Sequence, residues 1–182
     1  MKYKVTKTQF PEVLILEPVI HDDHRGLFYE SFNKKEFELI TGLNKEFVQD
    51  NYCISKKNVL RGLHYQITKP QGKLVRVIKG NIFDIVVDLR KSSKNFGKWI
   101  SIEVSSKNQK QIWVPEGFAH GYLVISERAE VLYKTTEYWF PEFEACIKWD
   151  DKDLSIDWPV NQPILSKKDE DGLEFKDANT YK

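Results

Sequence analysis

The sequence predicts an all-β fold, an antiparallel sandwich or barrel with few helices. Short apolar stretches follow one another along the chain, separated by turn residues, and this spacing is typical of antiparallel sheets. Aromatic side chains make up 13% of the chain, which favours strands and a pocket with flat walls. A length of 182 residues suits one domain, residues 1–182.

Turn residues divide the central part of the chain into short strands. The expected strands are residues 74–78, 82–89, 99–104, 111–114, 122–125 and 130–136. Between the first two, the residues Lys79, Gly80 and Asn81 fit a tight hairpin. Residues 105–110 and 115–117 are predicted turns.

One helix is predicted shortly after residue 33. The run NKKE at residues 33–36 resembles a capping box, and Gly42 follows as a stop signal. Phe37, Leu39 and Ile40 are expected to supply the apolar face of this helix.

Charge and composition exclude several classes of protein. The net charge is +1, from 28 basic and 27 acidic residues, so no electrostatic surplus draws the chain onto nucleic acid or an anionic membrane. Cys53 and Cys146 are too few for a disulfide framework, and they form no CxxC pair. The sequence shows neither a signal peptide nor a bilayer-spanning run, which predicts a cytoplasmic protein. The polar tail from residue 166 is expected to pack loosely, with at most a short helix.

His64 is the leading candidate for proton transfer, since histidine titrates near pH ~6.5. It lies in the run RGLHYQ at residues 61–66. Strict alternation places His64 with Gly62 and Gln66 on one face of a strand. Arg61 then lies on the other face, unless a bulge at Gly62 turns it toward the same cavity. Taken alone, His64 fits a hydrogen-bonded structural role as well as a catalytic one.

Three further side chains are candidates for chemistry. Lys73 could polarise a carbonyl or hold a phosphate, although a lone lysine is more often a surface residue. Tyr133 is a candidate general acid, and the alternative for it is a place in the core. Asp169 either caps a helix with Ser166 or folds back to orient His64.

Other segments leave the same choice open. His120 lies beside Gly121, where a backbone can approach a ligand closely, but taken alone the segment favours a Gly/Pro turn with a structural histidine. Tyr138 and Trp139 could stack on a base or a sugar, or pack in the core. The chain has no HxH or HExxH motif, and His21 and His24 flank two aspartates in an expected loop. We therefore predict no metal site.

Over nearly its whole length the chain resembles the dTDP-4-dehydrorhamnose 3,5-epimerase family. The resemblance rests on the order and spacing of motifs rather than on any one of them. These motifs are residues 23–30, 48–51, 61–66, 72–76, 84–90, 114–122 and 133–138, followed by Pro141, Glu144, Trp158, Pro159 and residues 165–169. The sequence departs from the family at Cys53, where serine is frequent, and at Trp139, where tyrosine or phenylalanine is common.

The resemblance implies a cupin-type jelly-roll barrel that forms a homodimer, needs no metal or other cofactor, and binds a dTDP-linked 4-keto-6-deoxy sugar. It implies that His64 is the base, Asp169 its partner and Tyr133 the acid. The other implied substrate contacts are Arg61, Lys73, Gln49, Asn51, His120, Glu144 and Lys168. Arg25, Phe28 and Glu30 resemble the segment that a neighbouring subunit contributes to a shared nucleotide site, and Tyr138 resembles the aromatic residue near the nucleotide.

The implied reaction inverts C3 and C5 of dTDP-4-dehydro-6-deoxy-D-glucose to give dTDP-4-dehydro-L-rhamnose, in dTDP-rhamnose and surface-polysaccharide synthesis. Both hydrogens are α to the C4 ketone, so Lys73 could stabilise the enolate oxygen. No dinucleotide fingerprint is present, in agreement with a reaction that needs no redox cofactor. The alternatives are a single-carbon epimerase, a non-catalytic sugar-binding cupin and, as a third class, a metal-dependent cupin oxygenase.

Overall fold

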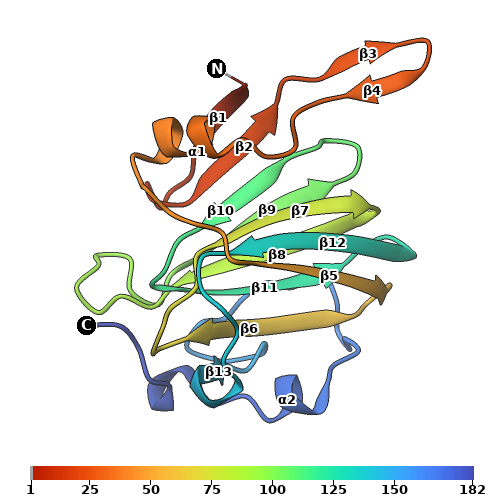
Figure 1. Cartoon of the computed structure of the whole chain (residues 1–182). Coiled ribbons are helices and arrows are strands. Elements are labelled where there is room, and N and C mark those ends of the chain that lie inside the picture. Colours follow the sequence, from red (N-terminus) through yellow and green to blue (C-terminus); the bar gives the residue numbers. More distant parts are fainter. Residues whose placement is uncertain (1) are drawn as a thin grey trace.

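The computed structural model describes residues 2–182, and most of its strands form two antiparallel sheets that face each other (Figure 1). One sheet has the strand order β1 (Tyr3–Lys7), β2 (Leu14–Pro18), β10 (Gln111–Val114), β7 (Lys73–Lys79), β12 (Arg128–Thr135) and β5 (Gln49–Lys56). The other has the order β13 (Glu144–Cys146), β6 (Leu60–Gln66), β11 (Phe118–Val124), β8 (Asn81–Asp88) and β9 (Trp99–Ser105). The predicted all-β fold is confirmed.

The remaining elements lie outside these two sheets. β3 (His21–Asp23) and β4 (Gly26–Phe28) form a separate hairpin that projects from the body (Figure 1). The helices are α1 (Lys34–Thr41), α2 (Lys167–Glu170) and the single 3₁₀ turns η1 (Pro141–Phe143) and η2 (Phe175–Asp177). Among residues 2–182, no helix has the length and apolarity needed to cross a membrane.

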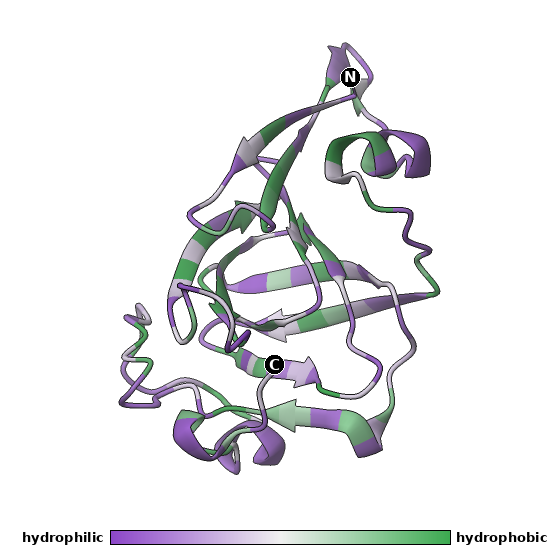
Figure 2. Ribbon diagram, turned by 90° about the vertical axis from the view of Figure 1, so that its left-hand side faces the viewer, coloured by the Kyte–Doolittle hydropathy of each residue, from purple (hydrophilic) through white to green (hydrophobic). Residues whose placement is uncertain are grey.

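Apolar side chains fill the space between the sheets and also cover their outer faces. Val75 of β7, Val86 of β8 and Val131 of β12 belong to the central core. A second cluster on the five-stranded sheet is covered by the chain after β13, and a third on the six-stranded sheet is covered by α1. Figure 2 shows the apolar stretches along the strands of both sheets. The sheets are therefore held rigidly enough to position side chains between them.

The helix predicted after Asn33 is present, but the assignment of Leu39 to its apolar face is wrong. The Asn33 side chain accepts a hydrogen bond from the Glu36 N–H, and Gly42 ends the helix in the left-handed conformation. Phe37 is buried, whereas Leu39 is 68% exposed. Two residues span about 200° of helical rotation, so Leu39 lies on the opposite side from Phe37.

The predicted hairpin at residues 79–81 is wrong. β7 and β8 follow each other across Gly80, yet β7 pairs with β10 and β12, and β8 pairs with β9 and β11. Gly80 has φ +86°, and a Cβ there would lie 2.2 Å from the Arg128 carbonyl oxygen. The turn therefore takes the chain from one sheet to the other, because the hydrogen-bond partners of β7 and those of β8 lie in different sheets.

The C-terminal tail contains the expected short helix, but it packs closely rather than loosely. The main chain of Phe175 donates to Asp151, and the Tyr181 hydroxyl donates to the Gln66 carbonyl oxygen at 2.6 Å. The aromatic residues of the tail cover the second apolar cluster. β11 also begins at Phe118, before the predicted strand at 122–125, so His120 lies within a strand rather than in a turn.

Candidate active site

A cavity of about 300 Å³ opens between the two sheets. Three strands of each sheet supply most of its wall: β5, β7 and β12 of the six-stranded sheet, and β6, β11 and β13 of the five-stranded sheet. It is lined by Gln49, Asn51, Cys53, Arg61, His64, Gln71, Lys73, His120, Tyr122, Tyr133, Trp139, Glu144 and Lys168. The structure thus brings together nine of the side chains singled out as substrate or catalytic contacts, from segments scattered over more than half of the chain.

A bulge at Gly62 brings Arg61 and His64 into the same cavity. The register between β6 and β11 shifts between His120 and Tyr122. Gly62 has φ +121°, and a Cβ there would lie 2.6 Å from the Cα of Gly121. Only glycine fits this close approach. Of the two alternatives that the sequence left open, the structure has the bulge.

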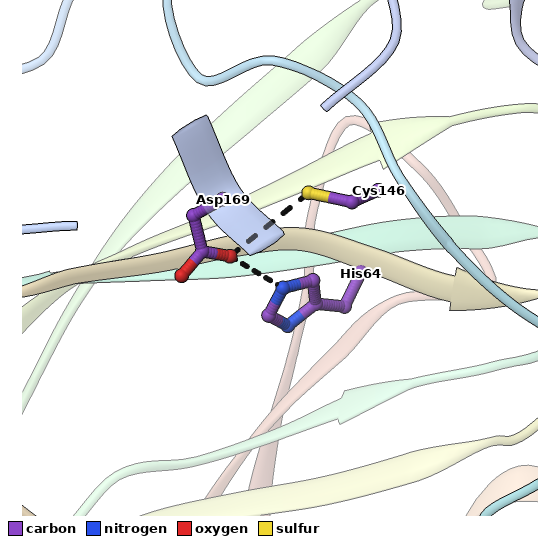
Figure 3. Close-up of side chains that lie close together, drawn as sticks. All are labelled: His64, Cys146 and Asp169. Carbon is purple, nitrogen blue, oxygen red and sulfur yellow. Dashed lines mark hydrogen bonds and ion pairs between the residues drawn. The ribbon is translucent and has the colours of Figure 1, made fainter. Parts of the chain in front are cut away.

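The imidazole of His64 is held by the carboxylate of Asp169 (Figure 3). Nε2 lies 2.6 Å from Oδ1, and the Asp169 side chain is 3% exposed. Asp169 also accepts hydrogen bonds from the Ser166 hydroxyl and the Gly62 N–H. Burial alone would raise the pKa of Asp169, but these hydrogen bonds outweigh it and lower the pKa to about 2.

His64 is a neutral base with a defined tautomer. Burial lowers its pKa, although the hydrogen bond to Asp169 acts in the opposite direction. Because ionised Asp169 can only accept, Nε2 carries the ring proton and Nδ1 keeps its lone pair. No side chain among residues 2–182 hydrogen-bonds to Nδ1. The geometry therefore leaves Nδ1 free to take a proton from a bound molecule.

Lys73 and Tyr133 complete the polar floor of the cavity. The Lys73 ammonium is buried and donates to the main-chain oxygen of His64 at 3.2 Å, and burial lowers its pKa to about 8. Burial raises the pKa of Tyr133 to about 12. At neutral pH the cavity therefore holds a cation and a protonated phenol.

Asp84 and His120 form a buried pair, of which only His120 was predicted as a site residue. His120 Nε2 lies 2.8 Å from Asp84 Oδ2, and Asp84 is fully buried. Burial raises the pKa of Asp84, and His120 opposes this effect. Asp84 was not predicted as a site residue, although an acidic residue within the apolar run 82–89 indicates a buried polar group with a specific partner.

Tyr122 and Gln71 are two further lining residues that sequence reasoning missed. Tyr122 follows His120 by two positions in β11, and this period-two spacing could have placed both on one face. The sulfur of Cys53 lies 2.8 Å from the Tyr122 hydroxyl, so the Cys53 departure from the family lies in the cavity wall.

The structure leaves four of the expected contacts outside the cavity of their own chain. Arg25 and Phe28 belong to the projecting β3–β4 hairpin, where Arg25 pairs with Asp23 and Phe28 is 70% exposed. Glu30 accepts from the Asn33 amide at 3.0 Å. Tyr138 is 55% exposed, and it is the adjacent Trp139 that lines the cavity.

Glu144 and Lys168 form an ion pair at the cavity wall. Their side-chain atoms lie 2.8 Å apart, and Glu144 is the more buried of the two. Burial by itself would raise the pKa of Glu144, but the Lys168 ammonium outweighs burial and lowers it. The pair joins β13 to α2, the helix that carries Asp169.

One group of side chains within residues 2–182 has the composition of a metal site. His64, Cys146 and Asp169 each offer one ligand atom, and these atoms lie within 4.8 Å of one another (Figure 3). His21 and His24 lie in the exposed β3–β4 hairpin region, outside this group. The absence of a required metal stays a prediction.

Comparison with known proteins gives a consistent family. The family model described as dTDP-4-dehydrorhamnose 3,5-epimerase matches residues 7–177. An enzyme of that name from Pseudomonas aeruginosa is 50% identical over 179 residues, covering 98% of this chain and 99% of its own length. The chain belongs to the dTDP-4-dehydrorhamnose 3,5-epimerase family.

Solved structures of this family share the fold. An epimerase from Legionella pneumophila, solved in complex with dTDP-4-keto-L-rhamnose, superimposes with a TM-score of 0.95 and 46% identity, covering 97% of this chain and 95% of that chain. A 3′-monoepimerase from Streptomyces bikiniensis, in complex with dTDP-quinovose, gives a TM-score of 0.88 and 30% identity, covering 93% and 87%. The cupin-type jelly-roll barrel is confirmed, and single-carbon epimerases share it.

Proposed function

We propose that this protein inverts C3 and C5 of dTDP-4-dehydro-6-deoxy-D-glucose and releases dTDP-4-dehydro-L-rhamnose. One observation carries the proposal: a neutral His64, oriented by ionised Asp169, and a protonated Tyr133 line one cavity from opposite sheets. Inversion of a carbon needs a base on one face of the sugar ring and an acid on the other.

His64 acts as the base at both carbons. C3 and C5 are each α to the C4 ketone, so loss of either proton leaves an enolate. Nδ1 takes the proton, Asp169 stabilises the imidazolium that forms, and the imidazolium returns this proton to solvent before the second carbon reacts. A base with a pKa below its ordinary value stays unprotonated at neutral pH and is ready at every turnover.

Lys73 stabilises the negative charge that develops on the C4 oxygen. Its ammonium is buried, where a charge interacts more strongly than it does in water. Its bond to the His64 main-chain oxygen keeps it beside the base. Tyr133 then donates its hydroxyl proton to the opposite face of the enolate carbon, and solvent restores that proton.

The remaining lining residues bind the substrate. Arg61 supplies a cation for the diphosphate, and its Nε donates to Ser55 at 3.1 Å. The further proposed contacts are Gln49, Asn51, His120, Glu144 and Lys168. Tyr138 contacts the nucleotide from the segment beside Trp139.

The protein works as a cytoplasmic homodimer of single-domain chains, with each nucleotide site shared between two subunits. Arg25, Phe28 and Glu30 do not line the cavity of their own chain. The β3–β4 hairpin carrying the first two projects from the body (Figure 1). A projecting hairpin of this kind can reach a neighbour's cavity, where Arg25 and Phe28 contact the dTDP moiety.

Proton NMR of the product formed in deuterated water tests the reaction. Each inverted carbon exchanges its hydrogen for deuterium, so deuterium at both C3 and C5 is the expected result. His64→Ala is expected to abolish exchange at both positions while retaining dTDP binding. Deuterium at one carbon alone would favour a single-carbon epimerase, whose fold is the same. Unchanged turnover by His64→Ala would remove His64 from the mechanism.

A further inference from the structure

Cys146 lies beside the His64–Asp169 pair and takes no part in the chemistry proposed above. β13 pairs with β6 so that Cys146 stands directly opposite His64. Its sulfur lies 3.9 Å from Asp169 Oδ1, the oxygen that also contacts His64 Nε2 (Figure 3). An imidazole nitrogen, a sulfur and a carboxylate oxygen therefore meet at one point.

We propose that His64, Cys146 and Asp169 bind Zn²⁺, and that the bound ion inhibits the enzyme. These three ligand types are the ones that Zn²⁺ takes in proteins, with water in the fourth position. A thiolate and an imidazole disfavour Mg²⁺ and Ca²⁺, which take oxygen ligands. Because the ion would bind the proposed base His64, it inhibits the reaction and is not its cofactor.

The distances fit this ion after small movements. Zinc bonds of about 2.0–2.3 Å in a tetrahedron place the ligand atoms roughly 3.3–3.6 Å apart. The observed separations are 2.6 Å between His64 Nε2 and Asp169 Oδ1 and 3.9 Å between that oxygen and the Cys146 sulfur. The first separation has to open and the second to close, each by less than about 1 Å, and the third, between His64 Nε2 and the Cys146 sulfur, is at most 4.8 Å.

Binding would disable the base through its tautomer. Zn²⁺ takes the lone pair of Nε2, so the Nε2 proton of His64 is transferred to Nδ1. The Cys146 thiol loses its proton to solvent as the zinc–sulfur bond forms. Nδ1 then carries a hydrogen and cannot accept one from the substrate. The inhibition rests on the proposed function, whereas the binding of the ion does not.

Titration with Cd²⁺, a spectroscopic substitute for Zn²⁺, tests the binding without any enzyme assay. Cadmium–thiolate bonds absorb in the ultraviolet, and we expect the band to saturate at one ion per chain. Cys146→Ala should weaken binding at least ~10–100-fold, the loss that even an outer partner of a metal ligand causes. Cys53→Ala is the matched control, because Cys53 lies in the cavity wall but outside the cluster. It should bind Cd²⁺ as the wild type does.

Turnover measured with added ZnCl₂ tests the inhibition. Cys146→Ala should keep the basal rate and need at least tenfold more Zn²⁺ for half-inhibition than the wild type and Cys53→Ala need. The diphosphate of the substrate also binds Zn²⁺, but equally in all three assays. Equal Cd²⁺ binding by Cys146→Ala and the wild type would overturn the site. If Cys146→Ala misfolds, Cys146→Ser keeps the side-chain size and removes the thiol. An inactive wild type that still shows the cadmium band would refute only the proposed function.

Discussion

The Lys73 ammonium lies 3.2 Å from the main-chain oxygen of His64. The proposed oxyanion partner and the proposed base are thus joined by one hydrogen bond between β7 and β6, strands of different sheets. This hydrogen bond fixes the position of the cation relative to the strand that carries the base. Both groups also have lowered pKa values, because both are buried.

These two pKa values predict the pH dependence of kcat/KM. His64 must be neutral, so activity is lost as the pH falls through a value below the ordinary ~6.5 of histidine. Lys73 must be charged, so activity is lost as the pH rises through about 8, by about tenfold per pH unit. Tyr133, with a pKa of about 12, leaves this range unaffected.

A pH series of kcat/KM checks both limbs. Lys73→Met should lose most of its turnover at every pH. Lys79→Met, at the exposed end of the same strand, should keep the wild-type profile. An alkaline limb that begins only above about pH 10 would mean that Lys73 does not supply the charge.

Asp169→Asn should reduce kcat by about 10²–10⁴-fold with little change in KM. The amide can donate to Nε2 and then favours the wrong tautomer of His64, as in other histidine–aspartate pairs. Asp171→Asn is a matched control in the same segment, since Asp171 is exposed and pairs with Lys167. Kinetics of the two variants side by side measure the effect, and a similar loss in both would point to disruption of α2 instead.

Local sequence patterns correctly predicted those structural elements that are determined by a few neighbouring residues. The Asn33 cap and the left-handed Gly42 each follow from one or two residues, whereas Gly62 indicated a bulge only as an alternative to regular alternation. The hairpin predicted at residues 79–81 was wrong because the hydrogen-bond partners of β7 and β8 are set by the packing of two sheets, which no local turn pattern encodes. The prediction that the tail packs loosely was wrong for a similar reason, since its few aromatic residues cover an apolar surface formed by distant parts of the sequence.

The site was foreseen by motif resemblance more than by physical reasoning. Residue types alone left His64 and Asp169 with structural alternatives, and only the fold shows them 2.6 Å apart across 105 positions of sequence. Asp84 was not predicted as a site residue because only its hydrogen bond to His120, on the neighbouring strand, connects this buried acid to the site. Such pairings depend on strand register, and register is fixed by the whole sheet.

Tyr133→Phe should separate proton removal from inversion. His64 can still form the enolate, so deuterium should enter C3 and C5 from solvent, while epimer formation falls by about 10²–10⁴-fold without its acid. The exposed Tyr52 on the neighbouring strand β5 offers the control, and Tyr52→Phe should behave as the wild type. Deuterium incorporation and product epimers are counted in the same NMR sample. Equal loss of exchange and inversion would make Tyr133 part of the base machinery.

Mixing two inactive variants should restore activity if the nucleotide site is shared. Arg25→Ala keeps its own His64 but has a defective hairpin, and His64→Ala keeps the hairpin but lacks the base. A mixed dimer then has one site with both intact, and random pairing gives about a quarter of the wild-type rate. Arg25 is 79% exposed and pairs with Asp23 alone within residues 2–182, so its loss should leave the subunit folded. Co-expression of the two chains and measurement of turnover decide the matter: activity equal to the sum of the separate variants would place the hairpin outside the partner's site.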